Sequence, residues 1–507
     1  MTEAKRFFKS GILLTLVGLA MRTVAMFFGA FISRTVGAEG TGIYTLVMTV
    51  YSFAITVATS GISLTVTRLV ASAIGAGEQE RVGSVLRGAF IFSLCFGLIA
   101  TLGLFFGAEL IGDVILSDDR TVTSLRVLAF SLIPASIGSA LSGYFVGVKR
   151  VGFNAAASIF CQLIKIILTV ALVTYLSPYG IVASVIGLCI GITVTEILGF
   201  LLIFFEFLYD WHKNAKKSAL KNAELKGVAA TALPLAFSAY VRSILLNIEH
   251  ILIPKKLRER GEGAGEAYAH YGILHGMALP LVTYPMSPLS SFAGLLVPEF
   301  AEDMGAGRQQ RMNRVASKAF NTTMTYAIIS AVFLFVFAEE LGYVIYDSYS
   351  AGHYISTLAV VVPIMYLDHV TDSMLKGIGE QVFSMWVNIT DSLLSVILVW
   401  FLIPKMGIMG YAVVIIIMEG YNFLLSFLRL RRKISFKITP IKSAIMPLLA
   451  TIISTRLALR IFRFSGSCTS PLWLVLKIVF ALCITLSALA LLDAKREIFN
   501  KKVSINK

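Results

Sequence analysis

Long apolar runs, each bounded by charged or turn-forming residues, follow one another along the whole chain. A helix that crosses the hydrocarbon core of a bilayer needs about 20 predominantly apolar residues, and the runs are of this length. They predict about 14 membrane-spanning helices, at residues 10–33, 42–67, 88–112, 123–147, 154–176, 180–206, 227–253, 271–297, 316–338, 354–376, 381–403, 407–428, 441–462 and 470–492.

The composition supports this pattern and excludes a soluble globular protein. Hydrophobic residues make up 57% of the 507 residues and charged residues only 14%, whereas soluble domains carry about 25% charged residues. The mean hydropathy is +0.81. We therefore expect an all-α polytopic membrane protein.

Lys and Arg residues collect in every second connection between the predicted helices, for example at 213–226, 308–318 and 429–437. Basic loops stay on the cytoplasmic side during insertion, so both termini are expected to be cytoplasmic. The net charge of +15 follows from this bias and indicates attraction to anionic membrane lipids. It does not indicate a nucleic-acid partner.

One polar phrase occurs twice, as GAGEQERV at 75–82 and GAGRQQRM at 305–312. With the same offset of 230, residues 71–115 and 301–345 are identical at 17 of 45 positions. Shared apolarity would not place Gly-Ala-Gly, Gln and Arg together in matching loops. The chain therefore contains an internal duplication.

The spacing of the two copies predicts the architecture. Six predicted helices separate them, so both copies cross the membrane in the same direction, as in transporters built from parallel repeats. We expect two pseudo-repeated six-helix lobes around a central cavity, with two extra C-terminal helices. The predicted divisions are an N-lobe at 1–206, a basic cytoplasmic linker helix at 207–226, a C-lobe at 227–433, and the last two helices with a tail at 434–507.

Polar side chains inside the predicted helices mark candidate positions in the cavity. A charged residue in mid-membrane costs about 2.5 to 3.5 kcal/mol on insertion scales, so it faces a cavity or a partner. Arg22 and Arg242 lie in the helices that open the two lobes, and arginine matches phosphate oxygens with a rigid fork of donors. The alternative is that each arginine pairs with a nearby carboxylate. The candidate substrate-binding residues are Arg22, Arg242, Glu249, Ser238, Thr15 and Thr56.

Three carboxylates are candidates for coupling transport to H⁺ or Na⁺: Asp368, Asp372 and Glu196. Asp368 and Asp372 lie one turn apart, and two like charges so placed favour proton or sodium binding. The alternative is an ion pair of Asp372 with Lys376. Lys165 can also extend its charge toward a helix end.

Sequence motifs for catalysis are absent. There is no GxxxxGK[ST] loop for ATP, and no HExxH or GxSxG motif. The five cysteines lack disulfide or metal-ligand spacing. We expect no enzyme activity, no metal site and no cofactor other than a coupling ion.

Three segments resemble one known family: FISRTVGAEGTGIYTL at 31–46, RLVASAIGAGEQERV at 68–82 and LLVPEFAEDMGAGRQQ at 295–310. They are similar to the stage V sporulation protein B branch of the polysaccharide transporters, a superfamily that includes lipid II flippases and multidrug exporters. In the lipid II branch, arginines of the first helix line the cavity. Arg22 looks like the first of these, and Phe28 stands where that branch has another arginine.

The resemblance implies an alternating-access flippase of the bacterial plasma membrane, acting as a monomer. Its substrate would be a saccharide linked to undecaprenyl pyrophosphate, with the last two helices forming a groove for the lipid tail. A cation-coupled multidrug exporter of the same superfamily is the main alternative. A polytopic glycosyltransferase is a further alternative, and it lacks a catalytic constellation here.

Overall fold

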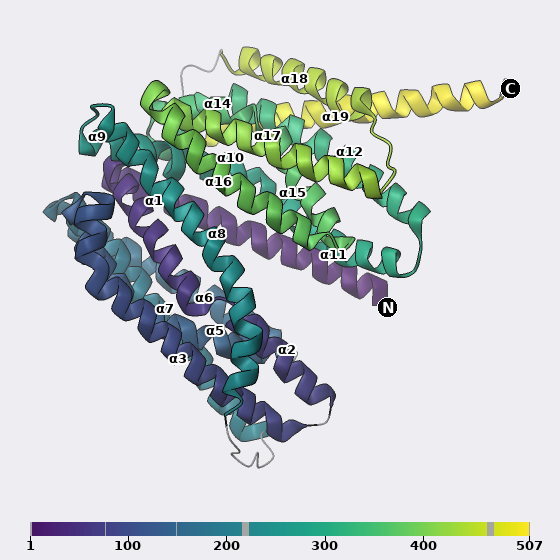
Figure 1. Ribbon diagram of the computed structural model, residues 1–507. Coiled ribbons are helices and arrows are strands. Elements are labelled where there is room, and N and C mark those ends of the chain that lie inside the picture. Colours follow the sequence, from purple (N-terminus) through teal and green to yellow (C-terminus); the bar gives the residue numbers. More distant parts are fainter. Residues whose placement is uncertain (1–2, 77, 149, 215–222, 464–470, 506–507) are drawn as a thin grey trace. The chain divides into compact units, whose positions relative to one another are not determined.

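The computed structural model describes residues 3–505, except 77, 149, 215–222 and 464–470. Side-chain environments are described for these residues, except 3–22, 75, 79, 151–158, 213–214, 234–235, 238, 291, 298, 301–302, 463 and 492–505. Within this part the regular structure is entirely helical (Figure 1).

The helices follow the predicted apolar runs closely, and the all-α polytopic fold is confirmed. They are α1 (Glu3–Thr59), α2 (Ile62–Gly75), α3 (Gln79–Glu109), η1 (Leu110–Leu116), η2 (Asp119–Thr121), α4 (Val122–Ala129), α5 (Leu132–Gly147), α6 (Val151–Leu176), η3 (Ser177–Tyr179), α7 (Ile181–Asn214), α8 (Leu225–Glu259), α9 (Ala264–Tyr271), η4 (Gly272–Ala278), α10 (Leu279–Thr283), η5 (Tyr284–Met286), α11 (Ser287–Gly305), α12 (Gln309–Val336), α13 (Ala338–Tyr346), α14 (Tyr349–Ala359), α15 (Val362–Gly377), α16 (Gln381–Met406), α17 (Ile408–Lys433), η6 (Ile441–Ile445), α18 (Met446–Arg463) and α19 (Pro471–Ile505).

Nine helices in the described part are long and apolar enough to cross a membrane, or eleven if each of two bent pairs is one span. One of the nine, Thr23–Ile74, has 52 residues and is long enough for two crossings. The predicted spans at 227–253 and 271–297 are not among them. The first contains residues 234–235 and 238, whose side-chain environments lie outside the described residues. The second is divided into several short helices and contains prolines at 280, 285 and 288. The count of 14 is consistent with the structure without being confirmed by it.

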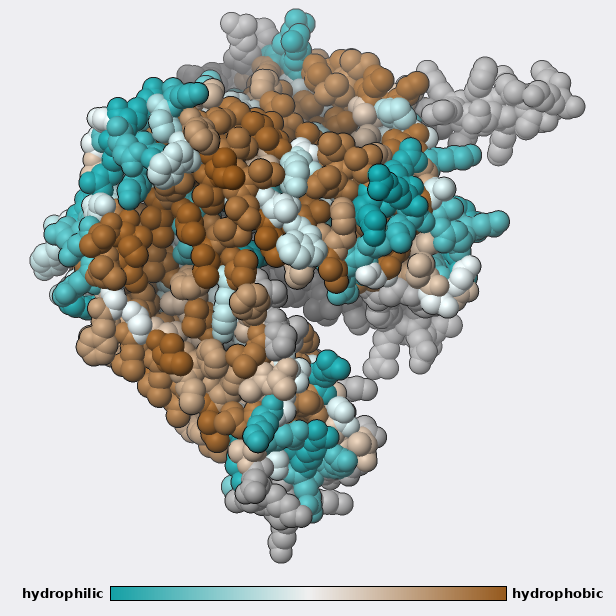
Figure 2. Space-filling model, viewed as in Figure 1, coloured by the Kyte–Doolittle hydropathy of each residue, from teal (hydrophilic) through white to brown (hydrophobic). Residues whose placement is uncertain are grey.

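Apolar side chains remain exposed on the flanks of the long helices, as expected of surfaces that face lipid. On α3 they include Leu98, Ile99, Leu102 and Phe106. Figure 2 shows hydrophobic residues (brown) along the helix flanks and hydrophilic residues (teal) gathered at helix ends. The chain is a multi-span membrane protein.

The structure confirms the internal duplication. Three pairs of helices begin at positions that keep the offset of 230: α3 and α12, α5 and α15, and α6 and α16. Ser117 and Asp347, which are related by the same offset, are the two described non-glycine residues with positive φ, at 55° and 56°. The bent pairs correspond as well, with α4 and α5 at 43° and α14 and α15 at 57°.

Packing divides the chain into two compact units. Unit 1 is Met1–Arg34 with Ile273–Lys507, and unit 2 is Thr35–Gly272. Corresponding helices pack in corresponding ways: α5 against α2, α3 and α7 in unit 2, and α15 against α11, α12 and α17 in unit 1. Each unit has its own buried apolar core around these helices. The two C-terminal helices α18 and α19 pack against each other within unit 1.

The compact units differ from the predicted lobes of 1–206 and 227–433. The first part of α1, up to Arg34, packs with the second copy in unit 1, and α8 packs with the first copy in unit 2. In unit 1, Arg34 of α1 donates a hydrogen bond to the carbonyl of Ile345 at 2.9 Å and another to the carbonyl of Val344. In unit 2, Arg258 of α8 donates to the carbonyl of Ser117 at 2.8 Å. Both arginines therefore bind the turn that ends at the positive-φ residue. Of the predicted linker helix at 207–226, the first part belongs to α7, and 215–222 lies outside the described residues.

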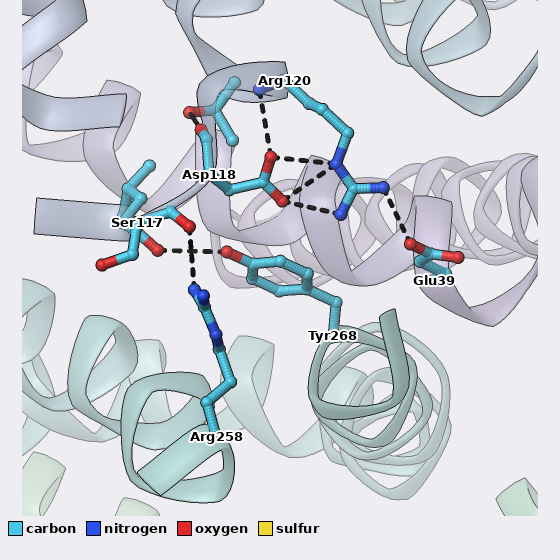
Figure 3. Close-up of polar contacts among 8 residues, drawn as sticks. Glu39, Ser117, Asp118, Arg120, Arg258 and Tyr268 are labelled. Atoms are coloured by element: carbon cyan, nitrogen blue, oxygen red, sulfur yellow. Dashed lines mark hydrogen bonds and ion pairs between the residues drawn. The ribbon is translucent and has the colours of Figure 1, made fainter. Parts of the chain in front are cut away.

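A network of polar side chains surrounds the turn of unit 2 (Figure 3). Asp118 accepts hydrogen bonds from the Nε and Nη2 of Arg120 at 2.9 and 2.7 Å, and Arg120 Nη1 donates to Glu39 at 2.8 Å. The Arg120 guanidinium lies over the ring of Tyr268, 5.9 Å from its centroid. Arg120 thus connects the turn to both α1 and α9.

The connection between α15 and α16 is held by charge. Glu380 forms ion pairs with Arg429 at 2.9 Å and Lys433 at 3.0 Å, both at the end of α17. In the other copy the polarity is reversed, because Arg150, the equivalent of Glu380 under the offset of 230, pairs with Asp210 near the end of α7. Hydrogen bonds from Lys433 and Arg429 hold the pKa of Glu380 below its usual range.

This lowered pKa predicts a pH-dependent contribution to stability. A carboxyl whose pKa is lower in the folded state stabilises the fold above its unfolded pKa of about 4.3, and the contribution is lost as the pH falls through the folded pKa. We expect Glu380→Gln to lower the melting temperature at pH 7 and to make no difference in strong acid. Thermal unfolding of purified protein from pH 7 to pH 3 measures this. Glu339→Gln, at an exposed carboxylate of unit 1, is the control, and an equal effect of both variants would contradict the prediction.

Candidate functional site

The structure describes only some of the predicted cavity residues. Arg22, Thr15 and Ser238 have side chains outside the described residues. Arg242 is exposed on α8, and Glu249, two turns further along the same helix, is buried. Because α1 up to Arg34 and α8 belong to different units, the facing of Arg22 and Arg242 across a cavity stays a prediction.

Thr56, the remaining cavity candidate, is half-buried on α1. Its hydroxyl donates to the carbonyl of Ser52 in the same helix at 2.7 Å. This local bond leaves the oxygen able to accept a hydrogen bond from a ligand. A role for Thr56 in substrate binding stays a prediction.

The paired carboxylates of α15 are both half-buried, and one has a cation partner. Asp372 lies 2.6 Å from the Nζ of Lys376, which is the contact of the alternative interpretation. One carboxylate oxygen of Asp368 is buried without a hydrogen-bond partner among the described residues. Asp368 is therefore the better candidate of the two for binding a proton or cation, and ion coupling stays a prediction.

Glu196, the third coupling candidate, lines an open cavity whose walls all belong to unit 2. The cavity has a volume of about 430 Å³ and lies among α1, α5, α6 and α7. Its walls are Ile55, Thr59, Pro134, Ala135, Gly138, Ser139, Ser142, Cys161, Gln162, Lys165, Thr195, Glu196, Gly199, Phe200 and Ile203. We call it the unit 2 cavity.

Consecutive antiparallel helices bring two opposite charges into this cavity. Lys165 of α6 and Glu196 of α7 are both half-buried, and α6 packs along α7. No ion pair or hydrogen bond joins either side chain to another described residue. Lys165 thus faces a cavity, an orientation that the sequence interpretation of a lysine extending to a helix end did not predict.

Sequence reasoning missed the uncharged part of the cavity wall. Gln162, Ser139 and Ser142 carry no pattern of their own, because single polar residues are common in membrane helices. The available signal was the pair of mid-helix charges, Lys165 and Glu196, in two neighbouring predicted helices. These two charges indicate which helices line a polar cavity, but they do not show which other side chains point into that cavity.

Comparisons with known proteins find two family models and related membrane proteins. The family described as polysaccharide biosynthesis protein matches residues 7–304, and the MatE family matches residues 275–401. Stage V sporulation protein B of Bacillus subtilis (strain 168) is 26% identical over 417 residues, covering 81% of this chain and 80% of that protein. Lipid II flippase MurJ of the same organism is 21% identical over 480 residues, covering 89% of this chain and 87% of that protein.

Solved structures show the same fold at low sequence identity. The inward closed conformation of lipid II flippase MurJ has a TM-score of 0.70 at 17% identity, covering 97% of this chain and 99% of that chain. An inward-facing multidrug resistance MATE family transporter of the MOP superfamily has a TM-score of 0.67 at 18% identity, covering 83% of this chain and 98% of that chain. The chain therefore belongs to the polysaccharide biosynthesis protein family and has the fold of MOP-superfamily transporters.

Proposed function

We propose that this protein is a flippase that moves a saccharide linked to undecaprenyl pyrophosphate across a bacterial plasma membrane by alternating access, with both termini in the cytoplasm. The observation that carries the proposal is the extent of its structural likeness. The flippase structure covers 97% of the chain, whereas the multidrug transporter structure covers 83%. The flippase likeness thus extends over nearly the whole chain, as expected if α18 and α19 have counterparts there.

Each part of such a substrate needs a different environment. The pyrophosphate requires hydrogen-bond donors that stay protonated, and Arg22 and Arg242 supply guanidinium groups for this role. The polyprenyl tail remains in hydrocarbon, where α18 and α19 expose apolar side chains such as Leu449, Ile453 and Val479. A polar head can then cross through protein while the tail stays in lipid.

An inward proton or sodium gradient would drive the cycle, with Asp368, Asp372 and Glu196 as the candidate sites. Carboxylates inside membrane helices are typical of such coupling, because taking up a cation removes the cost of a buried negative charge. Asp368, with an unpartnered oxygen, is the first residue to test.

Reconstitution tests the proposal directly. We expect vesicles that contain the purified protein to translocate a fluorescent undecaprenyl-pyrophosphate-linked saccharide, and Arg22→Ala or Arg242→Ala to slow translocation about tenfold or more. A hydrogen bond to a charged group contributes about 1.5 to 3 kcal/mol, which corresponds to at least this factor. Arg260→Ala removes an exposed arginine from the end of α8 and should leave the rate unchanged.

The MatE match at residues 275–401 favours a second candidate, a cation-coupled multidrug exporter. The same vesicles distinguish the two. Uptake of a cationic dye without translocation of the lipid-linked saccharide would contradict the flippase proposal and support the exporter.

A further inference from the structure

We propose that the unit 2 cavity is a saccharide-binding site that takes a neutral, hydroxyl-rich sugar ring. The inference rests on the proposed function and adds to it, because it assigns the sugar part of the substrate to a site separate from the arginines. Its basis is the size of the cavity, the charges in its wall and the kinds of uncharged group beside them.

Small residues create the space. Gly138 of α5 has no heavy atom within 4 Å of the position that a Cβ would occupy. Gly199 of α7 faces the Cys161 sulfur, at 3.4 Å from such a Cβ. The cavity is open on one side, and its volume of about 430 Å³ among four helices leaves room for a ligand. The volume lies within the range of about 300 to 1,000 Å³ that is typical of small-ligand pockets.

The charges argue against an ionic ligand. Lys165 and Glu196 give the wall one positive and one negative group, so the cavity has no net preference for an anion such as pyrophosphate or for an organic cation. Lys165 and Glu196 attract each other without forming an ion pair, and half-buried charges remain costly unless hydrogen bonds satisfy them. A ligand with many hydroxyl groups can do so, because each hydroxyl can donate to the carboxylate and accept from the ammonium group.

The uncharged wall provides further partners of the type that a sugar uses. Gln162 offers both a donor and an acceptor, and Ser139 offers a hydroxyl. Thr59 and Thr195 already donate to the carbonyls of Ile55 and Gly191, each at 2.7 Å, so their oxygens remain as acceptors. Phe200 adds an aromatic surface for the apolar C–H face of a ring.

Cys161 in the wall provides a native reporter for binding. The full-length protein is purified with Cys95, Cys189, Cys468 and Cys483 replaced by serine, and the rate of alkylation of Cys161 by N-ethylmaleimide is measured. N-acetylglucosamine and glucose should slow this rate at saturating concentration, because a bound ring blocks access to the sulfur. Inorganic pyrophosphate and choline should not slow it.

Variants separate specific binding from a general effect on the protein. Lys165→Gln and Glu196→Gln should each weaken sugar protection about tenfold, the effect of losing one charge-assisted hydrogen bond. Gly138→Leu should remove protection by filling the cavity. Glu206 lies on the same helix as Glu196 but outside the cavity wall, so in Glu206→Gln the sugars should protect Cys161 as they do in the parent. For each variant, the alkylation rate with sugar is compared with the rate of the same variant without sugar.

The outcomes decide between this inference and the proposed function. Protection by pyrophosphate or choline but not by sugars would overturn the inference in favour of an anion or cation site, and no protection by any probe would also overturn it. Translocation of lipid-linked saccharide without sugar protection would leave the proposed function standing and the inference rejected. Sugar protection without translocation would support the site and count against the flippase.

Discussion

Replacing Gly42 by alanine lowers the melting temperature of the purified protein by several degrees, and valine at this position lowers it further. A Cβ on Gly42 would lie 1.9 Å from the carbonyl oxygen of Tyr268, which is far inside contact distance. The obstacle is backbone, which cannot rotate away as a side chain can. Overpacking typically costs about 1 to 3 kcal/mol, and we expect a value near the upper end.

Replacing Gly272 by alanine should lower the melting temperature in the same way, because Gly272 lies on the opposite side of this contact. A Cβ there would lie 2.4 Å from the carbonyl oxygen of Ala38 and 2.5 Å from the backbone nitrogen of Gly42. Gly42 and Gly272 are related by the offset of the duplication. They are therefore equivalent positions of the two copies, and their backbones lie against each other. Small residues allow membrane helices this close approach.

Thermal unfolding in detergent, followed by size-exclusion chromatography, measures the effect. Gly103→Ala is the matched control, because this helical glycine of α3 has nothing within 4 Å of its Cβ position. Alanine there should be neutral or slightly stabilising, since it favours a helix by up to about 1 kcal/mol. If Gly42→Ala melts like Gly103→Ala, the close approach of the two backbones is not needed for stability.

The sequence predicted the helices well because hydropathy and helix length are local properties. The run at 154–176 became α6, and the run at 381–403 became α16, with the offset of 230 kept at both helix ends. Breaks within runs were not predicted. Gly61, for example, adopts a positive φ of 77° and separates α1 from α2 inside one apolar run.

Packing between distant helices could not be predicted from hydropathy. The first part of α1 packs with the second copy and α8 packs with the first. Hydrogen bonds of Arg34 and Arg258 contribute to this packing, and an apolar pattern does not show which turn an arginine will bind. The same limit applies to the candidate site. Glu196 was recognised as a buried carboxylate and Lys165 was interpreted as extending to a helix end, because the cavity that they share depends on how α6 and α7 pack.

Asp118→Ala should destabilise the protein by about 3 kcal/mol, because it removes one partner of a largely buried ion pair. The Asp118 side chain is 5% exposed, and it also accepts a hydrogen bond from the backbone nitrogen of Arg120 at 3.0 Å. Without the carboxylate, Arg120 keeps Glu39 as its partner but loses the group that fixes it to the turn. The connection of this turn to α1 and α9 is then weakened (Figure 3).

The second copy provides an intermediate variant. Ser348, the equivalent of Asp118 in that copy, caps α14 by accepting a hydrogen bond from the backbone nitrogen of Ala351 at 3.2 Å, and it has no charge. Asp118→Ser should therefore keep the cap and lose the ion pair. Since a cap contributes about 1 kcal/mol, the melting temperature of this variant is expected to lie between those of the parent and Asp118→Ala.

Asp119→Ala is the control, because it removes a neighbouring carboxylate that is exposed and should change stability by less than about 0.5 kcal/mol. Hydrogen exchange adds a local measurement. Backbone amides of 116–121 should exchange faster in Asp118→Ala and unchanged in Asp119→Ala, because only the first variant releases the turn from Arg120. Equal melting temperatures and equal exchange in the two variants would show that the ion pair does not hold the turn. The turn would then be held by Arg258 and Tyr268, which donate hydrogen bonds to the carbonyls of Ser117 and Leu116.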